Sequence, residues 1–72
     1  MSIVVNIKHY IKEKGLKQKY VAERLNMTQQ EFSNILNGRK EFKTEYVVPM
    51  CNALGITANE LFTSPEQTTQ NT

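Results

Sequence analysis

The chain has 72 residues, a modest formal net charge of +2 and a single cysteine. This length allows one domain, whose core must be compact and helical or be completed by a second subunit. The lone Cys51 excludes an internal disulfide and favours a reducing compartment, and no apolar run is long enough to span a bilayer or resembles a secretory signal, so we expect a cytoplasmic protein.

Residues 3–14 have the pattern of a first helix, although the β-branched residues at its start weaken the first turn. Apolar residues recur at helical spacing along one face: Ile3, Ile7, Tyr10 and Ile11. Ser2 is a candidate N-cap, Gly15 ends the helix, and Leu16 turns back into the core. His9 falls between the apolar positions and is expected on the surface. With one histidine and one cysteine, the chain offers no metal-ligand set.

Two short helical patterns follow, over residues 18–25 and 29–36, with only a three-residue break between them. Each has an apolar face: Val21, Ala22 and Leu25 in the first, and Phe32, Ile35 and Leu36 in the second. Two helices joined by so short a break and buried on one side describe a helix-turn-helix. The small Ala22 lets the second helix cross over the first.

The ends of these two helices are also marked in the sequence. Thr28 and Glu31 form a Thr-x-x-Glu capping box that sets where the second helix begins. Asn26 ends the first helix, and Asn37 with Gly38 ends the second, because these residues tolerate the left-handed backbone conformation.

The outer face of the second helix is rich in amides rather than in the usual charged residues. It contains Gln29, Gln30, Ser33, Asn34 and Asn37. Gln and Asn side chains can pair with two atoms of an adenine edge in the DNA major groove. By composition alone, an ordinary polar surface and a base-reading surface fit about equally well. The capping box and the arrangement of the two helices favour base contacts.

Positions in register across most of the chain carry a family resemblance: Gln18, Ala22, Phe32, Ile35, Asn37-Gly38, Leu54-Gly55-Ile56 and Glu60-Leu61-Phe62. From about Ile7 to Phe62 the chain resembles the phage lambda repressor and Cro (XRE) family of helix-turn-helix DNA-binding domains. It departs from the family pattern at Asn26, where glycine is usual, and at Lys17, where a Ser or Thr N-cap is usual.

The resemblance implies an all-α, five-helix lambda repressor-like fold over residues 1–62, with helices 2 and 3 forming the helix-turn-helix, and a disordered tail over residues 63–72. It implies double-stranded DNA as the partner and a cytoplasmic protein of bacterial or phage origin that associates with the nucleoid when bound. The N-terminal residues of helix 3 would enter the major groove. Gln18 would contact a phosphate.

Two groups of DNA-contacting side chains are therefore expected. The base contacts would come from Gln29, Gln30, Ser33 and Asn34. The phosphate contacts would come from Gln18, Lys19, Thr28, Asn37, Arg39, Lys40 and Lys43. In the family's manner, backbone N–H groups after Gly38 would add to a phosphate clamp, the alternative being a merely solvated loop. Phe42 in this loop is expected to plug the core rather than lie at the surface.

A fourth helix should begin after Lys43 or Thr44 and run to about Leu54, but Pro49 interrupts its pattern. A proline removes a backbone hydrogen bond and crowds the carbonyl four residues earlier. The helix is therefore expected to be kinked, or to start near Pro49 after a looser turn. Its apolar face contains Val47, Met50, Cys51 and Leu54, and Cys51 is expected to act as a small buried apolar residue.

Thr57 and Glu60 form a second capping box, which opens a short fifth helix carrying Leu61 and Phe62. Those two residues either pack back on the first helix or form part of a dimer seam, and both can hold in one structure. The fifth helix and the region of Tyr46 are the expected dimer surface.

These features predict a sequence-specific DNA-binding transcriptional regulator, a repressor, that binds as a homodimer to half-sites about 10 base pairs apart. The alternative is a protein-interaction module such as an antitoxin or adaptor. That role would need an exposed apolar patch, for which only Tyr20, Phe42 and Tyr46 are candidates. No nucleophile, base and orienting group come together for catalysis, so we expect no enzyme activity, cofactor or small-molecule ligand.

Overall fold

The computed structural model of the protein describes residues 3–63, and these form five α-helices and one short 3-10 helix without any strand. The elements are α1 (Ile3–Glu13), α2 (Gln18–Arg24), α3 (Gln29–Leu36), η1 (Thr44–Tyr46), α4 (Val47–Leu54) and α5 (Ala58–Phe62). The all-α, five-helix prediction is therefore confirmed. The candidate N-cap Ser2 and residues 64–72 of the expected tail lie outside the described residues.

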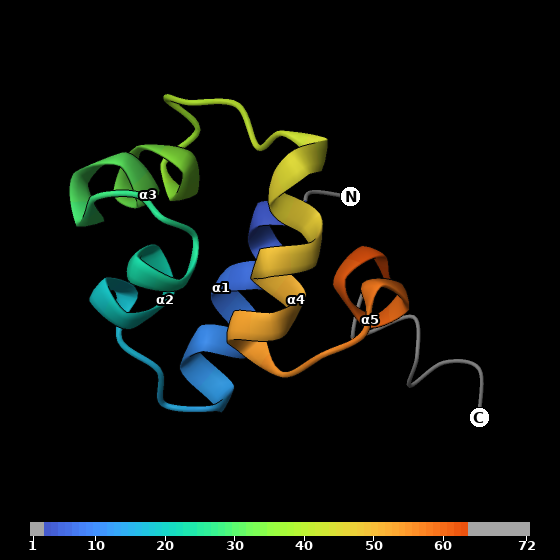
Figure 1. Ribbon diagram of the computed structural model, residues 1–72. Coiled ribbons are helices and arrows are strands. Elements are labelled where there is room, and N and C mark those ends of the chain that lie inside the picture. Colours follow the sequence, from blue (N-terminus) through green and yellow to red (C-terminus); the bar gives the residue numbers. More distant parts are fainter. Residues whose placement is uncertain (1–2, 64–72) are drawn as a thin grey trace.

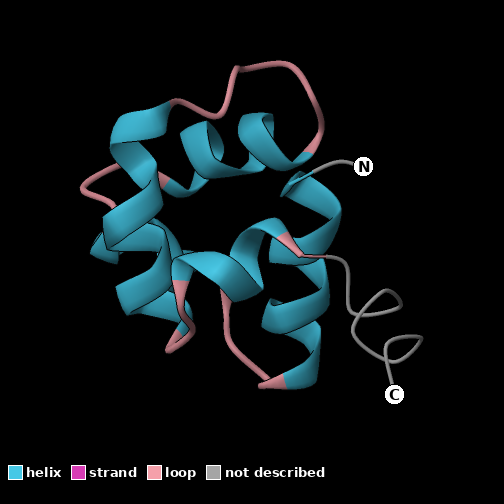
Figure 2. Ribbon diagram, turned by 90° about the vertical axis from the view of Figure 1, so that its right-hand side faces the viewer, coloured by secondary structure: helices cyan, strands magenta, loops and turns pink. Residues whose placement is uncertain are grey.

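The helices are arranged around α1 and α4. α2 and α3 pack on each other at one side of this pair, and α5 lies at the other side, in contact with both α1 and α4 (Figure 1). Residues 37–43 form the longest connection between helices and arch over one end of the molecule (Figure 2). The helix-turn-helix therefore lies on the side of the domain opposite to α5.

The predicted apolar faces form the core. Phe32 and Ile35 of α3 have no exposed surface, and Ala22 of α2 is nearly as buried, as a close crossing of the two helices requires. Other buried apolar side chains come from every α-helix: Ile7, Val21, Leu25, Leu36, Met50, Cys51, Ala53, Leu54 and Leu61. Phe42 is half-buried and packs against this core, with its ring edge-on to Tyr46.

Pro49 is accommodated by a late start of the regular helix rather than by a kink. The 3-10 turn η1 comes first, and α4 begins at Val47, two residues earlier than predicted. Pro49 is then the third residue of α4, where a backbone N–H would have no partner within the helix. Glu45, whose carbonyl the proline ring would crowd in a continuous helix, lies in η1 instead.

Two other helix ends differ from the prediction by one residue. α1 ends at Glu13 rather than residue 14, and α2 ends at Arg24, with Leu25 as its C-cap. Cys51 is buried as predicted, and burial raises the pKa of its thiol. Raising that pKa disfavours the reactive thiolate, which agrees with an apolar packing role.

Leu61 and Phe62 have separate roles in α5. Leu61 is fully buried in the core, whereas Phe62 is 55% exposed. Thr57 and Glu60 form the predicted capping box, in which the Glu60 N–H donates to the Thr57 hydroxyl over 3.1 Å and the Thr57 N–H donates to the Glu60 carboxylate over 2.9 Å. Because α5 contacts α1 and Leu61 is fully buried, the predicted packing of this helix back on the first helix is confirmed.

One buried polar side chain joins the two ends of the described chain. Asn6 of α1 is 1% exposed, and its amide Nδ2 donates to the carbonyl of Leu61 over 2.7 Å and to that of Thr63 over 3.4 Å. Those carbonyls lie at the C-terminal end of α5, where a helix leaves its own acceptors unused. Asn6 therefore fixes the end of α5 against α1.

Replacing Asn6 by alanine should lower the free energy of unfolding by about 1–3 kcal/mol, because the Leu61 carbonyl would stay buried without its donor. Urea unfolding followed by circular dichroism measures this loss. Asn52→Ala is the matched control, because Asn52 is exposed on α4 and its loss should change the stability by no more than about 0.5 kcal/mol. Equal, small effects of both substitutions would contradict the proposed role of Asn6.

Candidate nucleic-acid interface

The start of α3 is fixed by the predicted capping box. The Thr28 hydroxyl accepts from the Glu31 N–H over 3.1 Å, and the Glu31 carboxylate accepts from the Thr28 N–H over 2.9 Å. Because Phe32 and Ile35 are fully buried, the helix is also fixed in its rotation about its own axis. Gln29 and Gln30, in the first turn of α3, are therefore exposed, while Ser33 and Asn34 remain half-buried.

The turn before α3 has the expected backbone. Asn26 adopts the left-handed conformation, with φ of 59°, although it is not a glycine. The Met27 N–H donates to the Ala22 carbonyl over 3.0 Å and closes the corner between the helices. At the other end of α2, Lys17 makes no side-chain cap, which agrees with its being an unusual residue for that position.

The amide-rich face of α3 is ordered by two hydrogen bonds between residues four apart. The Gln30 amide Nε2 donates to the Asn34 side-chain oxygen over 3.2 Å, and the Asn37 amide Nδ2 donates to the Ser33 hydroxyl over 3.3 Å. Gln29, at the first position of α3, is exposed. All four residues predicted to contact bases thus lie on one helix, with Gln29 and Gln30 exposed and Ser33 and Asn34 half-buried.

The loop after α3 directs its cations outwards while its first backbone amides turn inwards. The N–H groups of Arg39 and Lys40 both donate to the Asn34 carbonyl, over 2.8 and 3.2 Å. These two amides are therefore already hydrogen-bonded within the protein. A phosphate would have to be contacted by the side chains of Arg39 and Lys40 instead. Arg39 and Lys43 are exposed and make no ion pair within residues 3–63.

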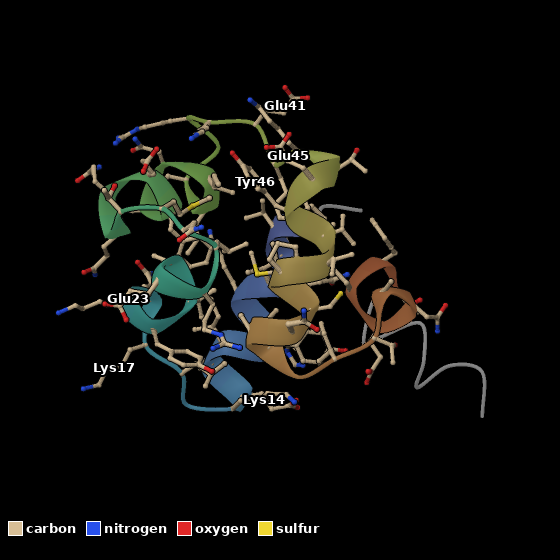
Figure 3. All side chains as sticks on the ribbon, in the orientation of Figure 1. Lys14, Lys17, Glu23, Glu41, Glu45 and Tyr46 are labelled. Carbon is tan, nitrogen blue, oxygen red and sulfur yellow. The ribbon has the colours of Figure 1, made fainter. Side chains whose placement is uncertain are left out.

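Lys40 differs from the other two cations of the loop. Its ammonium Nζ lies 3.5 Å from the Glu31 carboxylate, so its charge is partly compensated. Two carboxylates follow Lys40 in the chain and lie on the same side as Tyr46: Glu41 in the loop and Glu45 in η1 (Figure 3). The loop therefore carries one carboxylate between its cations, and a second carboxylate follows in η1.

On the α1 side of α3 lies a hollow of about 400 Å³. Residues of three helices and of the turn between α1 and α2 line it: Lys8, Ile11, Lys12, Gly15, Leu16, Gln18, Ser33, Leu36 and Asn37. Three of these, Gln18, Ser33 and Asn37, were predicted to contact DNA. The sequence did not assign Lys8 and Lys12, because their position beside α3 results from packing between distant segments. Their spacing of four residues on α1 was the one local signal.

The remaining phosphate candidates, Lys19 and Thr28, are both exposed, Lys19 in the first turn of α2 and Thr28 at the N-cap of α3. Lys17 and Glu23 also project outwards from this side of the domain (Figure 3). Among the described residues no group of His, Cys, Asp and Glu side chains could hold a metal ion, and within the same residues no helix is long and apolar enough to cross a membrane.

The capping box also changes the acidity of Glu31. Hydrogen bonds from Thr28, with attraction to Lys40 as a smaller cause, lower the pKa of the Glu31 carboxyl below its ordinary value of 4.5. The carboxylate is therefore the form that the folded protein prefers, and its contribution to stability is present above about pH 4.5 and is lost as the pH falls through the lowered pKa.

Comparison with known proteins agrees with this geometry. The family model HTH_3, described as helix-turn-helix, matches residues 7–61. Among solved structures, the chain is similar to the crystal structure of a hypothetical transcription factor, NHTF, from Neisseria, with a TM-score of 0.82 and 20% sequence identity over 97% of this chain and 80% of that chain. No curated protein matches the chain. At this identity the structural likeness shows a shared fold.

Replacing Glu31 by glutamine should reduce the stability that the protein loses on acidification from about pH 6 to about pH 3, because the variant has no carboxylate there to protonate. Urea unfolding of both proteins at the two pH values measures the difference. Glu23→Gln serves as the control, because Glu23 is an exposed carboxylate that accepts no hydrogen bond from residues 3–63. The same acid dependence in the Glu31 variant as in the unsubstituted protein would contradict the role of Glu31.

Proposed function

The chain belongs to the lambda repressor and Cro family of helix-turn-helix DNA-binding domains, and we propose on this premise that it is a sequence-specific transcriptional regulator that reads the DNA major groove with α3. The observation that carries the proposal is the outer face of α3, where Gln29, Gln30 and Asn34 project from a helix that is fixed in start and rotation. A major groove admits one α-helix, and amide side chains match the donor and acceptor of an adenine edge.

The base contacts would come from the N-terminal half of this face. Gln29 and Gln30 lie in the first turn of α3, and Gln30 already holds Asn34 through a hydrogen bond. Ser33 is half-buried and would add a contact only where a base edge approaches the α1 side of the helix. Gln29 and Gln30 are therefore the principal candidates for reading sequence.

Phosphate contacts would flank α3 and set affinity and register. Arg39 and Lys43 present uncompensated charges after its C-terminus, whereas Lys40 would have to share its charge with Glu31. Further neutral and basic donors along the DNA backbone would be Gln18, Lys19, Thr28 and Asn37. Binding should weaken steeply with salt, because each neutralised phosphate releases counterions.

A homodimer would bring two copies of α3 to two half-sites about 10 base pairs apart. The exposed apolar side chains that support this proposal come from α1, α4 and α5. Val5, Val48 and Phe62 are 59%, 69% and 55% exposed. A nearby groove of about 330 Å³ is lined by Ile3, Phe42, Thr44, Val47 and Phe62. α5 lies on the side of the domain away from α3, so a second copy seated against α5 would leave both reading helices accessible (Figure 1).

The exposed apolar residues are largely not those suggested by the sequence. Of the three aromatic candidates, Tyr20 is exposed, but Phe42 and Tyr46 are half-buried and pack edge-on with ring centroids 5.8 Å apart. The surface near α5 would also suit a protein partner of an antitoxin or adaptor. Such a role is the alternative, and it would leave the amide-rich face of α3 without a function.

The proposal is tested by selecting bound sites from random duplex DNA at physiological salt. The expected result is a short inverted repeat, whose spacing fixes how the two domains sit. A reporter gene whose promoter overlaps that repeat should be repressed when the protein is present. A folded protein that enriches no sequence over the starting pool would overturn the proposal and favour the protein-interaction role.

Replacing Gln29 by alanine should weaken binding to the selected site by roughly 1–3 kcal/mol and leave non-specific binding nearly unchanged, because a base contact is lost. Titrations of both kinds of duplex measure the two affinities. Arg39→Ala is the contrasting variant, since loss of a phosphate contact should weaken both duplexes equally and flatten the salt dependence. An equal loss on both duplexes for the Gln29 variant would refute base reading by Gln29.

A further inference from the structure

We propose that α1 is a third DNA-contacting element, and that the hollow between α1, α2 and α3 holds a phosphate group of the DNA backbone. We call this hollow the α1 phosphate seat. Lys8 and Lys12 of α1 and Gln18 of α2 supply its donors. This inference rests on the proposed function and adds to it Lys8 and Lys12, two cations that belong neither to the helix-turn-helix nor to the loop after α3.

The charge of the seat favours an anion. Lys8 and Lys12 lie four residues apart on α1, so both side chains are on the same face of the helix. Neither makes an ion pair within residues 3–63, and no carboxylate lines the hollow. The acidic residue of this helix, Glu13, lies 3.6 Å from His9 instead. Two exposed ammonium groups therefore share a concave surface without a counter-charge from the described protein.

The neutral side chains of the seat can donate hydrogen bonds, so they favour a ligand that presents hydrogen-bond acceptors. Gln18 is exposed at the first position of α2 and has an amide that can donate. The Ser33 hydroxyl already accepts from the Asn37 amide, so its own hydrogen is available to donate elsewhere. A phosphate diester presents acceptor oxygens and a negative charge, which matches ammonium, amide and hydroxyl donors.

The position of the seat favours DNA over a separate small anion. Ser33 lies in α3 and Asn37 is the C-cap of that helix, so the seat borders the helix that would enter the groove. A groove that takes in α3 has a phosphate backbone on each side. Lys8 and Lys12 would meet a phosphate of the strand that passes α1.

The test is the salt dependence of binding to duplex DNA by Lys8→Gln and Lys12→Gln. Each substitution should reduce the slope of log affinity against log salt by about 0.9, which corresponds to an affinity about eight times lower at 0.1 M salt if affinities are equal at 1 M. Lys14→Gln is the matched control with the same charge change. The Lys14 ammonium lies 3.4 Å from the Gly55 carbonyl, at the α4–α5 turn, so this variant should keep the original slope.

Three outcomes separate the claims. Reduced slopes for the Lys8 and Lys12 variants beside an unchanged Lys14 variant would support the seat. Slopes equal to that of the Lys14 variant, in a protein that binds DNA, would overturn the seat and leave the proposed function intact. Failure of the unsubstituted protein to bind any duplex would overturn both. Lys8 and Lys12 are exposed, so urea unfolding should give these two variants the midpoint of the unsubstituted protein and show that their folding is unchanged.

A second measurement locates the contact. A single neutral methylphosphonate placed at the contacted phosphate should weaken binding of the unsubstituted protein and of the Lys14→Gln variant. It should weaken binding of a variant carrying both Lys8→Gln and Lys12→Gln much less, because the charge partner is already absent. Equal losses for all three proteins at every backbone position would contradict the seat.

Discussion

The arrangement of the site depends on the burial of one face of α3. Phe32 and Ile35 have no exposed surface, and Ala22 is small enough for α2 to pass beneath them. Burial of large apolar side chains is among the strongest stabilising contributions in a small domain. It also fixes the rotation of α3 about its axis, and with it the direction of every polar side chain on the opposite face. The capping box at Thr28 then fixes where along the axis that face begins.

Much of this was predictable from the sequence, because the signals are local. A capping box, a helical spacing of apolar residues and an asparagine at a left-handed turn each act within a few residues. They located α3 at both ends and α2 to within one residue, and they identified Thr57 and Glu60 at the start of α5. The core residues of α3 and the burial of Cys51 were predicted for the same reason.

The remaining features depend on contacts between distant segments. Nothing near Lys8 in the sequence shows that α1 lies beside α3, and nothing near Asn6 shows that its amide reaches Leu61. The inward turn of the Arg39 and Lys40 amides depends on the Asn34 carbonyl at the end of α3. The start of α4 lies two residues before the predicted start at Pro49. A kinked helix and a loose turn followed by a later helix start both accommodate a proline, so the local sequence did not choose between them.

The hydrogen bond between Gln30 and Asn34 has a consequence for the entropy of recognition. Ordering a free glutamine side chain costs up to about 2 kcal/mol of conformational entropy. Gln30 is already restrained by its bond to Asn34, yet its carbonyl oxygen and its second amide hydrogen stay available. Gln29 makes no such bond within the described residues and loses its full rotamer freedom when it meets a partner. Two neighbouring glutamines of the same chemistry thus differ in how much freedom each has left to lose.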